Sequence, residues 1–194
     1  MKRILLLFLF LALAVPGAFA QKDDHIEAGV FANYFRATQT TTNFAGLGAR
    51  FGFGIFDRVK LEAETAYDFN QVFTEGFTDT STGTVTLARS NLRVLHGMLG
   101  PKLSLGHGRL RPFLTVKGGG LVFLFDNRPA TFNTFASSVQ SLRTSSVNPV
   151  LYPGGGLDGH IGPIGLRLDV GDEIYFNGGA HHNLRLAFGP YIRF

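Results

Sequence analysis

The last twelve residues of the chain alternate strictly between two kinds of side chain. One parity holds Leu184, Leu186, Phe188, Pro190, Ile192 and Phe194, and the other holds Asn183, Arg185, Ala187, Gly189, Tyr191 and Arg193. A period of two indicates a β-strand with one apolar and one polar face. The pattern continues to the aromatic Phe194 at the end of the sequence. A terminal strand of this kind is typical of a closed barrel whose outer face meets lipid, because a soluble sheet rarely ends on a regular strand with an exposed Phe.

The first twenty residues have the organisation of a secretory signal peptide. Lys2 and Arg3 precede an apolar stretch over 4–15, and Ala18-Phe19-Ala20 supplies a small-x-small cleavage site. The apolar stretch is shorter than the ~20 residues that a membrane-spanning helix needs, which disfavours an uncleaved anchor. We therefore expect a signal peptide over 1–20 and one barrel domain over 21–194. Cysteine is absent, which excludes a lipoprotein anchor, a disulfide framework and a thiolate metal site.

The composition limits the kinds of partner that this chain is expected to bind. Two of the 18 basic residues, Lys2 and Arg3, lie in the signal peptide, so the remaining chain has 16 basic residues against 14 acidic ones. No basic run accompanies this small excess, so we expect no nucleic-acid partner. Glycine (25 residues) and phenylalanine (20 residues) are abundant. Glycine relieves crowding in a curved sheet and aromatic residues gather at membrane interfaces, so both suit a small membrane barrel.

Eight strands are predicted, at 25–36, 44–56, 58–70, 88–103, 109–125, 148–160, 163–176 and 183–194. The connections between them alternate in length. Segments 37–43, 71–87, 126–147 and 177–182 are polar and mostly long, whereas 57–58, 104–108 and 161–163 are short. This alternation predicts an eight-stranded antiparallel up-and-down transmembrane β-barrel, with long loops outside the cell and tight turns in the periplasm.

Alternation within the strands assigns the two faces of the wall. A soluble sandwich would bury the apolar face, but the signal peptide, the loop alternation and the terminal Phe favour a barrel with apolar residues toward lipid. The residues then predicted to line the lumen are Arg50, Lys60, Arg93, Arg111, Lys117, Arg167 and Arg185, with Glu62, Glu64, Asp68, Asp158 and Asp169. His96 fits poorly, because it falls on the lipid-facing parity with Leu92, Val94 and Met98.

Two stretches resemble the small outer-membrane barrel family that includes OmpA-type and OmpX-type barrels. They are 188–194 (FGPYIRF) and the hairpin that runs from Gly100-Pro101-Lys102 through Pro112-Phe113 to Gly118-Gly119-Gly120. The resemblance covers residues 26–194 and implies a monomer in the bacterial outer membrane. It also implies that the barrel-assembly machinery reads the last strand, with Phe194 as the assembly signal. The peptidoglycan-binding domain of some relatives is expected to be missing.

The resemblance leaves an enzyme possible, since some small barrels modify lipid A. The His-x-Ser pair of the family's deacylases does not occur here, and no residue is predicted to be catalytic. His181 and His182 lie near Asp172 and Glu173, but adjacent strand residues point to opposite faces, which disfavours a metal site. We expect no cofactor and no metal.

A lumen of eight strands is only wide enough for side chains to fill. Charges of both signs in such a space must pair. We therefore favour a closed lumen held by ion pairs, specifically Arg50 with Glu64 and Glu62 with Arg93, over a narrow ion or solute pore, which stays the alternative. The expected function is structural or surface-interacting, with lipid, lipopolysaccharide and an extracellular ligand of the loops as partners.

Overall fold

A computed structural model describes residues 25–39, 41–78, 85–125 and 147–194. The strands within these ranges are β1 (Ile26–Ala37), β2 (Thr42–Phe56), β3 (Val59–Thr78), β4 (Val85–Ser104), β5 (Leu110–Phe125), β6 (Asn148–Ile161), β7 (Ile164–Asp172), β8 (Ile174–Phe176), β9 (Ala180–His181) and β10 (Leu184–Arg193). No helix in the described ranges is long and apolar enough to cross a membrane. The signal peptide predicted over 1–20 lies outside them.

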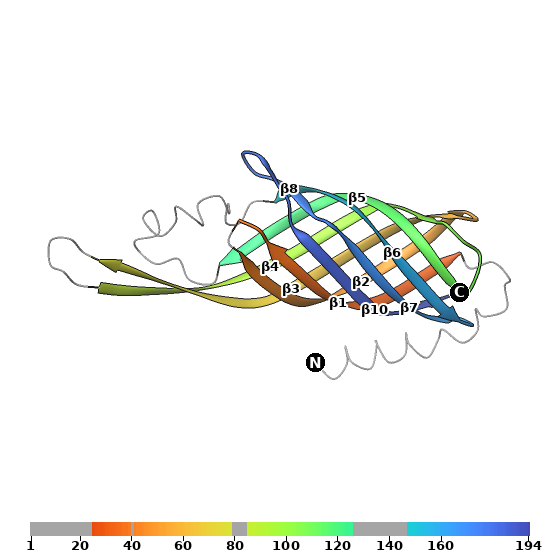
Figure 1. Ribbon diagram of the computed structural model, residues 1–194, viewed down its shortest axis with the longest axis horizontal. Coiled ribbons are helices and arrows are strands. Elements are labelled where there is room, and N and C mark those ends of the chain that lie inside the picture. The colour runs from red at the N-terminus through yellow and green to blue at the C-terminus, as the bar shows by residue number, and fades with distance from the viewer. Residues whose placement is uncertain (1–24, 40, 79–84, 126–146) are drawn as a thin grey trace, which may run out of the picture.

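The sheet closes on itself (Figure 1). Each strand from β1 to β6 pairs antiparallel with the next, and β10 pairs with both β7 and β1. Ile26 and Phe194 exchange backbone hydrogen bonds of 2.9 and 3.0 Å beside this last pairing. The short strands β8 and β9 continue β7 and β10 beyond small interruptions. The predicted eight-stranded antiparallel barrel is therefore confirmed.

The two ends of the barrel differ in their connections. Residues 57–58, 105–109 and 162–163 make the three short links, and β1 begins and β10 ends at the same edge (Figure 1). We call this edge the turn end and the opposite one the loop end. The segment predicted as a loop over 71–87 is mostly strand instead, because β3 and β4 stay paired from a bulge after Asp68 out to Thr78 and Val85. Its Val, Thr and Phe residues favour extended backbone over an open loop. Most of the predicted loop 126–147 lies outside the described residues.

The outer wall is apolar. Large exposed side chains on it include Leu47, Phe51, Leu61, Leu99, Leu114, Val116, Leu166, Leu168, Phe188 and Ile192. Buried residues alternate with them along the strands, and many of these buried residues are charged. This arrangement is the reverse of a soluble protein, and it suits a wall surrounded by hydrocarbon. The faces predicted for the strands around 50, 64, 117, 167 and 185 agree with the observed burial.

The fourth strand is the exception. Leu92, Val94, His96 and Met98 are buried inside the barrel, whereas Leu95, Leu99 and Leu103 face outward. The prediction for this strand is wrong because both of its faces carry apolar residues, so alternation alone did not separate them. Leu92, Val94 and Met98 of this inward set pack in an apolar core near the loop end that also contains Phe35, Phe44, Leu121, Phe123, Tyr152 and Tyr175.

Inward glycines make room for aromatic rings that lie against the wall. Three glycine–aromatic pairs lie directly opposite each other on neighbouring strands: Gly48 and Phe31, Gly156 and Phe113, and Gly165 and Tyr191. Arginines cover the rings: Arg50 lies 4.3 Å from the Phe31 centroid, and Arg167 lies 5.0 and 5.4 Å from those of Phe113 and Tyr191. Cations over ring faces within about 6 Å are attracted to them. The glycines therefore set the positions of the rings, and the rings help to place the arginines.

This packing predicts the effect of adding one methyl group. A Cβ at Gly165 would overlap the ring of Tyr191. We expect Gly165→Ala to destabilise the barrel by about 1–3 kcal/mol, as overpacking of a filled interior does. Urea unfolding of the refolded protein in detergent measures the difference. Gly97→Ala is the matched control, because a Cβ there meets nothing within 4 Å, and equal stability of the two variants would contradict the packing argument.

Candidate functional site in the barrel interior

The interior holds a connected set of charged side chains, which we call the lumen network. Its acidic members are Glu27, Glu62, Glu64, Asp68, Asp158, Asp169 and Glu173, and its basic members are Arg50, Lys60, His96, Lys102, Lys117, Arg167 and Arg185. All are buried, and each of the eight barrel strands supplies at least one. Buried charges are tolerated when they are paired and hydrogen-bonded, so the contacts within the network decide what the lumen can do.

The network begins at the turn end with two carboxylates. Glu27 accepts hydrogen bonds from Lys60 at 2.7 Å, from Lys102 at 2.8 Å and from Arg167 at 3.0 Å. Asp158 accepts from the same Lys102 at 2.8 Å and from Arg167 at 2.5 Å. These residues come from β1, β3, β4, β6 and β7, so the contacts cross the lumen as well as joining neighbouring strands.

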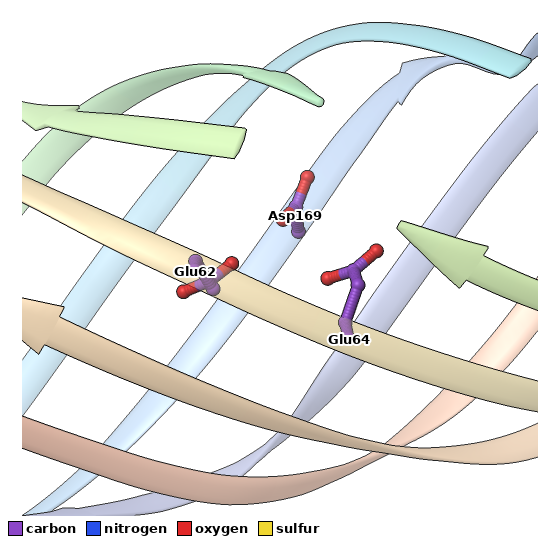
Figure 2. A group of neighbouring side chains, drawn as sticks. All are labelled: Glu62, Glu64 and Asp169. Atoms are coloured by element: carbon purple, nitrogen blue, oxygen red, sulfur yellow. The ribbon is translucent and has the colours of Figure 1, made fainter. Parts of the chain in front are cut away.

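Three carboxylates converge in the middle of the barrel: Glu62, Glu64 and Asp169 (Figure 2). Their oxygens lie within 4.8 Å of one another, which is close enough to coordinate a hard metal cation. The ammonium of Lys117 lies among them, 2.7 Å from Glu62, 2.6 Å from Glu64 and 3.8 Å from Asp169. Lys117 therefore supplies part of the positive charge that these carboxylates require.

Arginines link this central cluster to both ends. Arg167 pairs with Glu62 as well as with the carboxylates at the turn end. Arg185 pairs with Glu64 at 2.5 Å and donates to the amide oxygen of Asn33 at 2.8 Å. Because both guanidiniums bond to two levels of the network, the pairs form one connected set along the lumen.

His96 occupies the loop-end part of the network. Its Nδ1 lies 2.7 Å from Glu173, and its Nε2 lies 2.9 Å from Asp68. Only the doubly protonated imidazolium can donate to both carboxylates at once. Asn33 donates to Asp68 at 2.7 Å and thereby joins His96 to Arg185. The side chain that fitted the predicted lipid face poorly is thus a member of the lumen network.

The two predicted ion pairs are not formed. Arg50 lies directly opposite Glu64 in the strand register, but Lys117 and Arg185 bind the Glu64 carboxylate. Within the described part of the chain, Arg50 pairs with Asp169 at 3.7 Å, and neither of its terminal nitrogens has a hydrogen-bond partner there. Strand adjacency alone is a poor guide here, because side chains from opposite walls meet in a narrow lumen.

The other predicted pair, Glu62 with Arg93, is wrong because of where Arg93 lies. It lies on the outward parity of β4, where its Nη1 is 3.5 Å from the hydroxyl of the exposed Tyr67. Glu62 meets Lys117 and Arg167 instead. Sequence reasoning missed Lys102 and His96, which share the parity opposite to Arg93. Giving weight to both of them would have identified the inward face of β4.

The four residues weighed as a loop metal site, which the sequence disfavours, lie apart in the structure. His182 pairs with Asp172 at 2.5 Å on the surface. The ring of His181 packs against Tyr175 with 5.0 Å between centroids. Glu173 lies in the interior with His96. The four side chains therefore do not converge.

Comparison with solved structures places this architecture. Neisserial surface protein A is similar with a TM-score of 0.57 and 9% identity, over 88% of this chain and 96% of that one. Ail of Yersinia pestis has a TM-score of 0.51 and 13% identity, over 88% and 97%. Outer membrane protein W of E. coli has a TM-score of 0.50 and 15% identity, over 90% and 100%. This chain has the fold of the small outer-membrane β-barrels. Neither a family model nor a curated protein matches the sequence.

The lumen network predicts unequal roles for two buried arginines. Arg185→Met leaves Glu64 and Glu173 with fewer buried counter-charges, so we expect it to cost about 3–5 kcal/mol of unfolding free energy. Arg50→Met is the matched control, since Arg50 stacks on Phe31 and, among the residues that the structure describes, makes one long ion pair, and it should cost clearly less. Urea unfolding of both refolded variants measures the costs. Equal costs, or a larger cost for Arg50→Met, would contradict the assignment of contacts.

Proposed function

We propose that the protein is a non-enzymatic outer-membrane barrel with a closed lumen, whose extracellular end serves a structural or surface-interaction role. The observation that carries the proposal is the lumen network, in which carboxylates and cations contact each other from Glu27 at the turn end to Glu173 at the loop end. A conducting path would have to separate these pairs or pass around them. Arg167 and Arg185 also keep their protons in proteins, so the network is a poor proton relay.

The surface role rests on the loop end of the barrel. In Figure 1 the strands β3 and β4 extend well beyond the rest of the wall as a two-stranded ribbon. Functional contacts commonly lie on such projections from a rigid scaffold. Ail has been solved in complex with the heparin analogue sucrose octasulfate, so a protein with this fold binds a ligand. For this chain we propose an extracellular ligand of unspecified chemistry at the loop end. Lipid and lipopolysaccharide are the proposed partners of the outer wall.

The proposal includes the route to the membrane. Residues 1–20 act as a signal peptide and 21–194 form the barrel domain, which is inserted as a monomer by the barrel-assembly machinery. The backbone of Phe194 takes part in the closing pairing with Ile26, which makes it a reasonable assembly signal.

Conductance of the refolded protein in a planar bilayer tests the closed lumen. We expect the unaltered protein to give no steady current above that of the bare bilayer. The triple variant Glu64→Ala, Lys117→Ala, Arg185→Ala removes a linked part of the network, and current should appear if this network blocks the lumen. Heat-modifiable migration on gels confirms that both proteins are folded. A steady current through the unaltered protein would favour the pore, and modified lipid A in a mass assay would favour an enzyme.

Deletion of Phe194 tests the assembly signal. We expect a sharply lower yield in the outer-membrane fraction in a pulse-chase experiment, because the last strand then ends before its closing aromatic residue. Phe188→Ala removes an outward aromatic ring of β10 and keeps the terminus, so it serves as the control. Unchanged yield after deletion would exclude the assembly role of Phe194.

A further inference from the structure

Two open grooves adjoin each other on the outer wall near the turn end. Their volumes are about 570 and 640 Å³, which lie within the range of small-molecule sites. The smaller one follows the closing pair β1 and β10, and we call it the seam groove. The larger one follows the end of β6, and we call it the β6 groove. Ile164 of β7, which is exposed, lines both grooves and forms the ridge between them.

Gly159 is the floor of the β6 groove. It lies in register between Leu110 of β5 and Leu166 of β7, whose side chains are 63% and 54% exposed. Because Gly159 has no side chain, a trough remains along β6 between the two leucines. A Cβ at Gly159 would meet no atom nearer than 3.8 Å. Packing within the wall therefore does not require a glycine here, and the trough is open to whatever surrounds the barrel.

Small side chains form the seam groove in a similar way. Ala28 of β1 lies in register between Phe51 of β2 and Ile192 of β10. Ala49 of β2 is a second small residue of its lining. Ile192 in turn lies opposite Ile164, so the seam groove reaches the β6 groove at that one ridge. Two adjoining apolar grooves with a single side chain between them match the two acyl chains of one diacyl lipid.

Arg109 lies at the turn-end edge of the β6 groove. It is exposed and directly precedes β5, and its carbonyl oxygen accepts a hydrogen bond from the backbone of His160 at 2.9 Å, which ties it to the end of β6. A guanidinium can present two parallel donors to the oxygens of a phosphate. Among the described residues that line the two grooves there is no Asp or Glu, so the lining offers no carboxylate to a cationic headgroup.

We propose that the two grooves hold the acyl chains of one anionic phospholipid of the periplasmic leaflet, with its phosphate on Arg109. This inference rests on the proposed role of lipid as a partner of the outer wall, and it names the kind of lipid and its place. The turn end of such a barrel faces the periplasm. Chains that reach the wall from this edge therefore belong to phospholipid and not to lipopolysaccharide.

The headgroup and the chains contribute differently to binding. The surrounding hydrocarbon is as apolar as the grooves, so the chains gain van der Waals packing and little hydrophobic free energy. The contact between Arg109 and the phosphate therefore decides which lipid is retained, and the grooves decide where on the wall it lies.

Retention of lipid tests the site. The protein is reconstituted in nanodiscs with equal parts of phosphatidylglycerol and phosphatidylcholine of the same chain length, and it is then released into a maltoside detergent. Native mass spectrometry counts the lipids that stay on each barrel, and we expect one phosphatidylglycerol. Arg109→Gln should lower the ratio of retained phosphatidylglycerol to phosphatidylcholine about tenfold, the loss expected for a charged hydrogen-bond donor. Gly159→Leu fills the β6 groove and should lower the retention of both lipids severalfold.

Each variant has a matched control. Arg58→Gln removes an exposed arginine of the β2–β3 turn that lines neither groove. Gly118→Leu adds the same side chain at another exposed glycine outside both grooves, where a Cβ would meet no atom nearer than 3.9 Å. Both controls should retain lipid as the unaltered protein does. Heat-modifiable migration on gels shows that each variant is folded.

Three results would overturn the lipid site. They are equal losses in a variant and its control, equal retention of the two lipids by the unaltered protein, and a protein dimer that Gly159→Leu abolishes, which would assign the grooves to a second copy of the chain. Failure of the unaltered protein to insert into the nanodisc would overturn the proposed function as well. Insertion without selective retention would overturn the lipid site alone.

Discussion

Charge pairing across a narrow lumen is the constraint on which this barrel depends. Eight strands enclose too little space for the solvation of buried ions, so each carboxylate inside must contact a cation from the same chain. In the described ranges, seven buried carboxylates face six lysines and arginines and His96. The doubly bonded position of His96, between Asp68 and Glu173, brings the cations to the same number as the anions. Loss of one member therefore leaves charge uncompensated at other levels of the lumen.

The aromatic rings determine where the cations can lie. Arg167 contacts Phe113 and Tyr191, and Arg185 lies 5.6 Å from Phe31 and 5.3 Å from Tyr152. These rings would not fit against the wall if their neighbours were larger than glycine. The high glycine content of the sequence thus serves the electrostatics of the interior as well as the curvature of the sheet.

Period-two patterning predicted the strands, and together with the loop alternation, the expected signal peptide and the terminal Phe it predicted the closed barrel and the inward face of most strands. It placed Glu62, Glu64, Lys117, Arg167, Asp169 and Arg185 correctly inside. It failed on β4, where apolar residues fill both faces and a single arginine, Arg93, was given too much weight. It also failed on partners: the register put Arg50 opposite Glu64, but Glu64 contacts cations from β5 and β10 across the lumen. Pair assignments inside a barrel depend on its cross-section, which no single hairpin reveals.

The contacts of Arg167 have a mechanical consequence. From β7 it reaches Glu27 on β1, Glu62 on β3 and Asp158 on β6. It therefore acts as a cross-brace between walls that share no backbone hydrogen bonds with one another, such as β3 and β7. These ion pairs across the lumen oppose flattening of the barrel, because moving the opposite walls apart would lengthen them. The barrel should accordingly resist deformation by the lateral pressure of the surrounding membrane through its interior ion pairs as well as through the sheet.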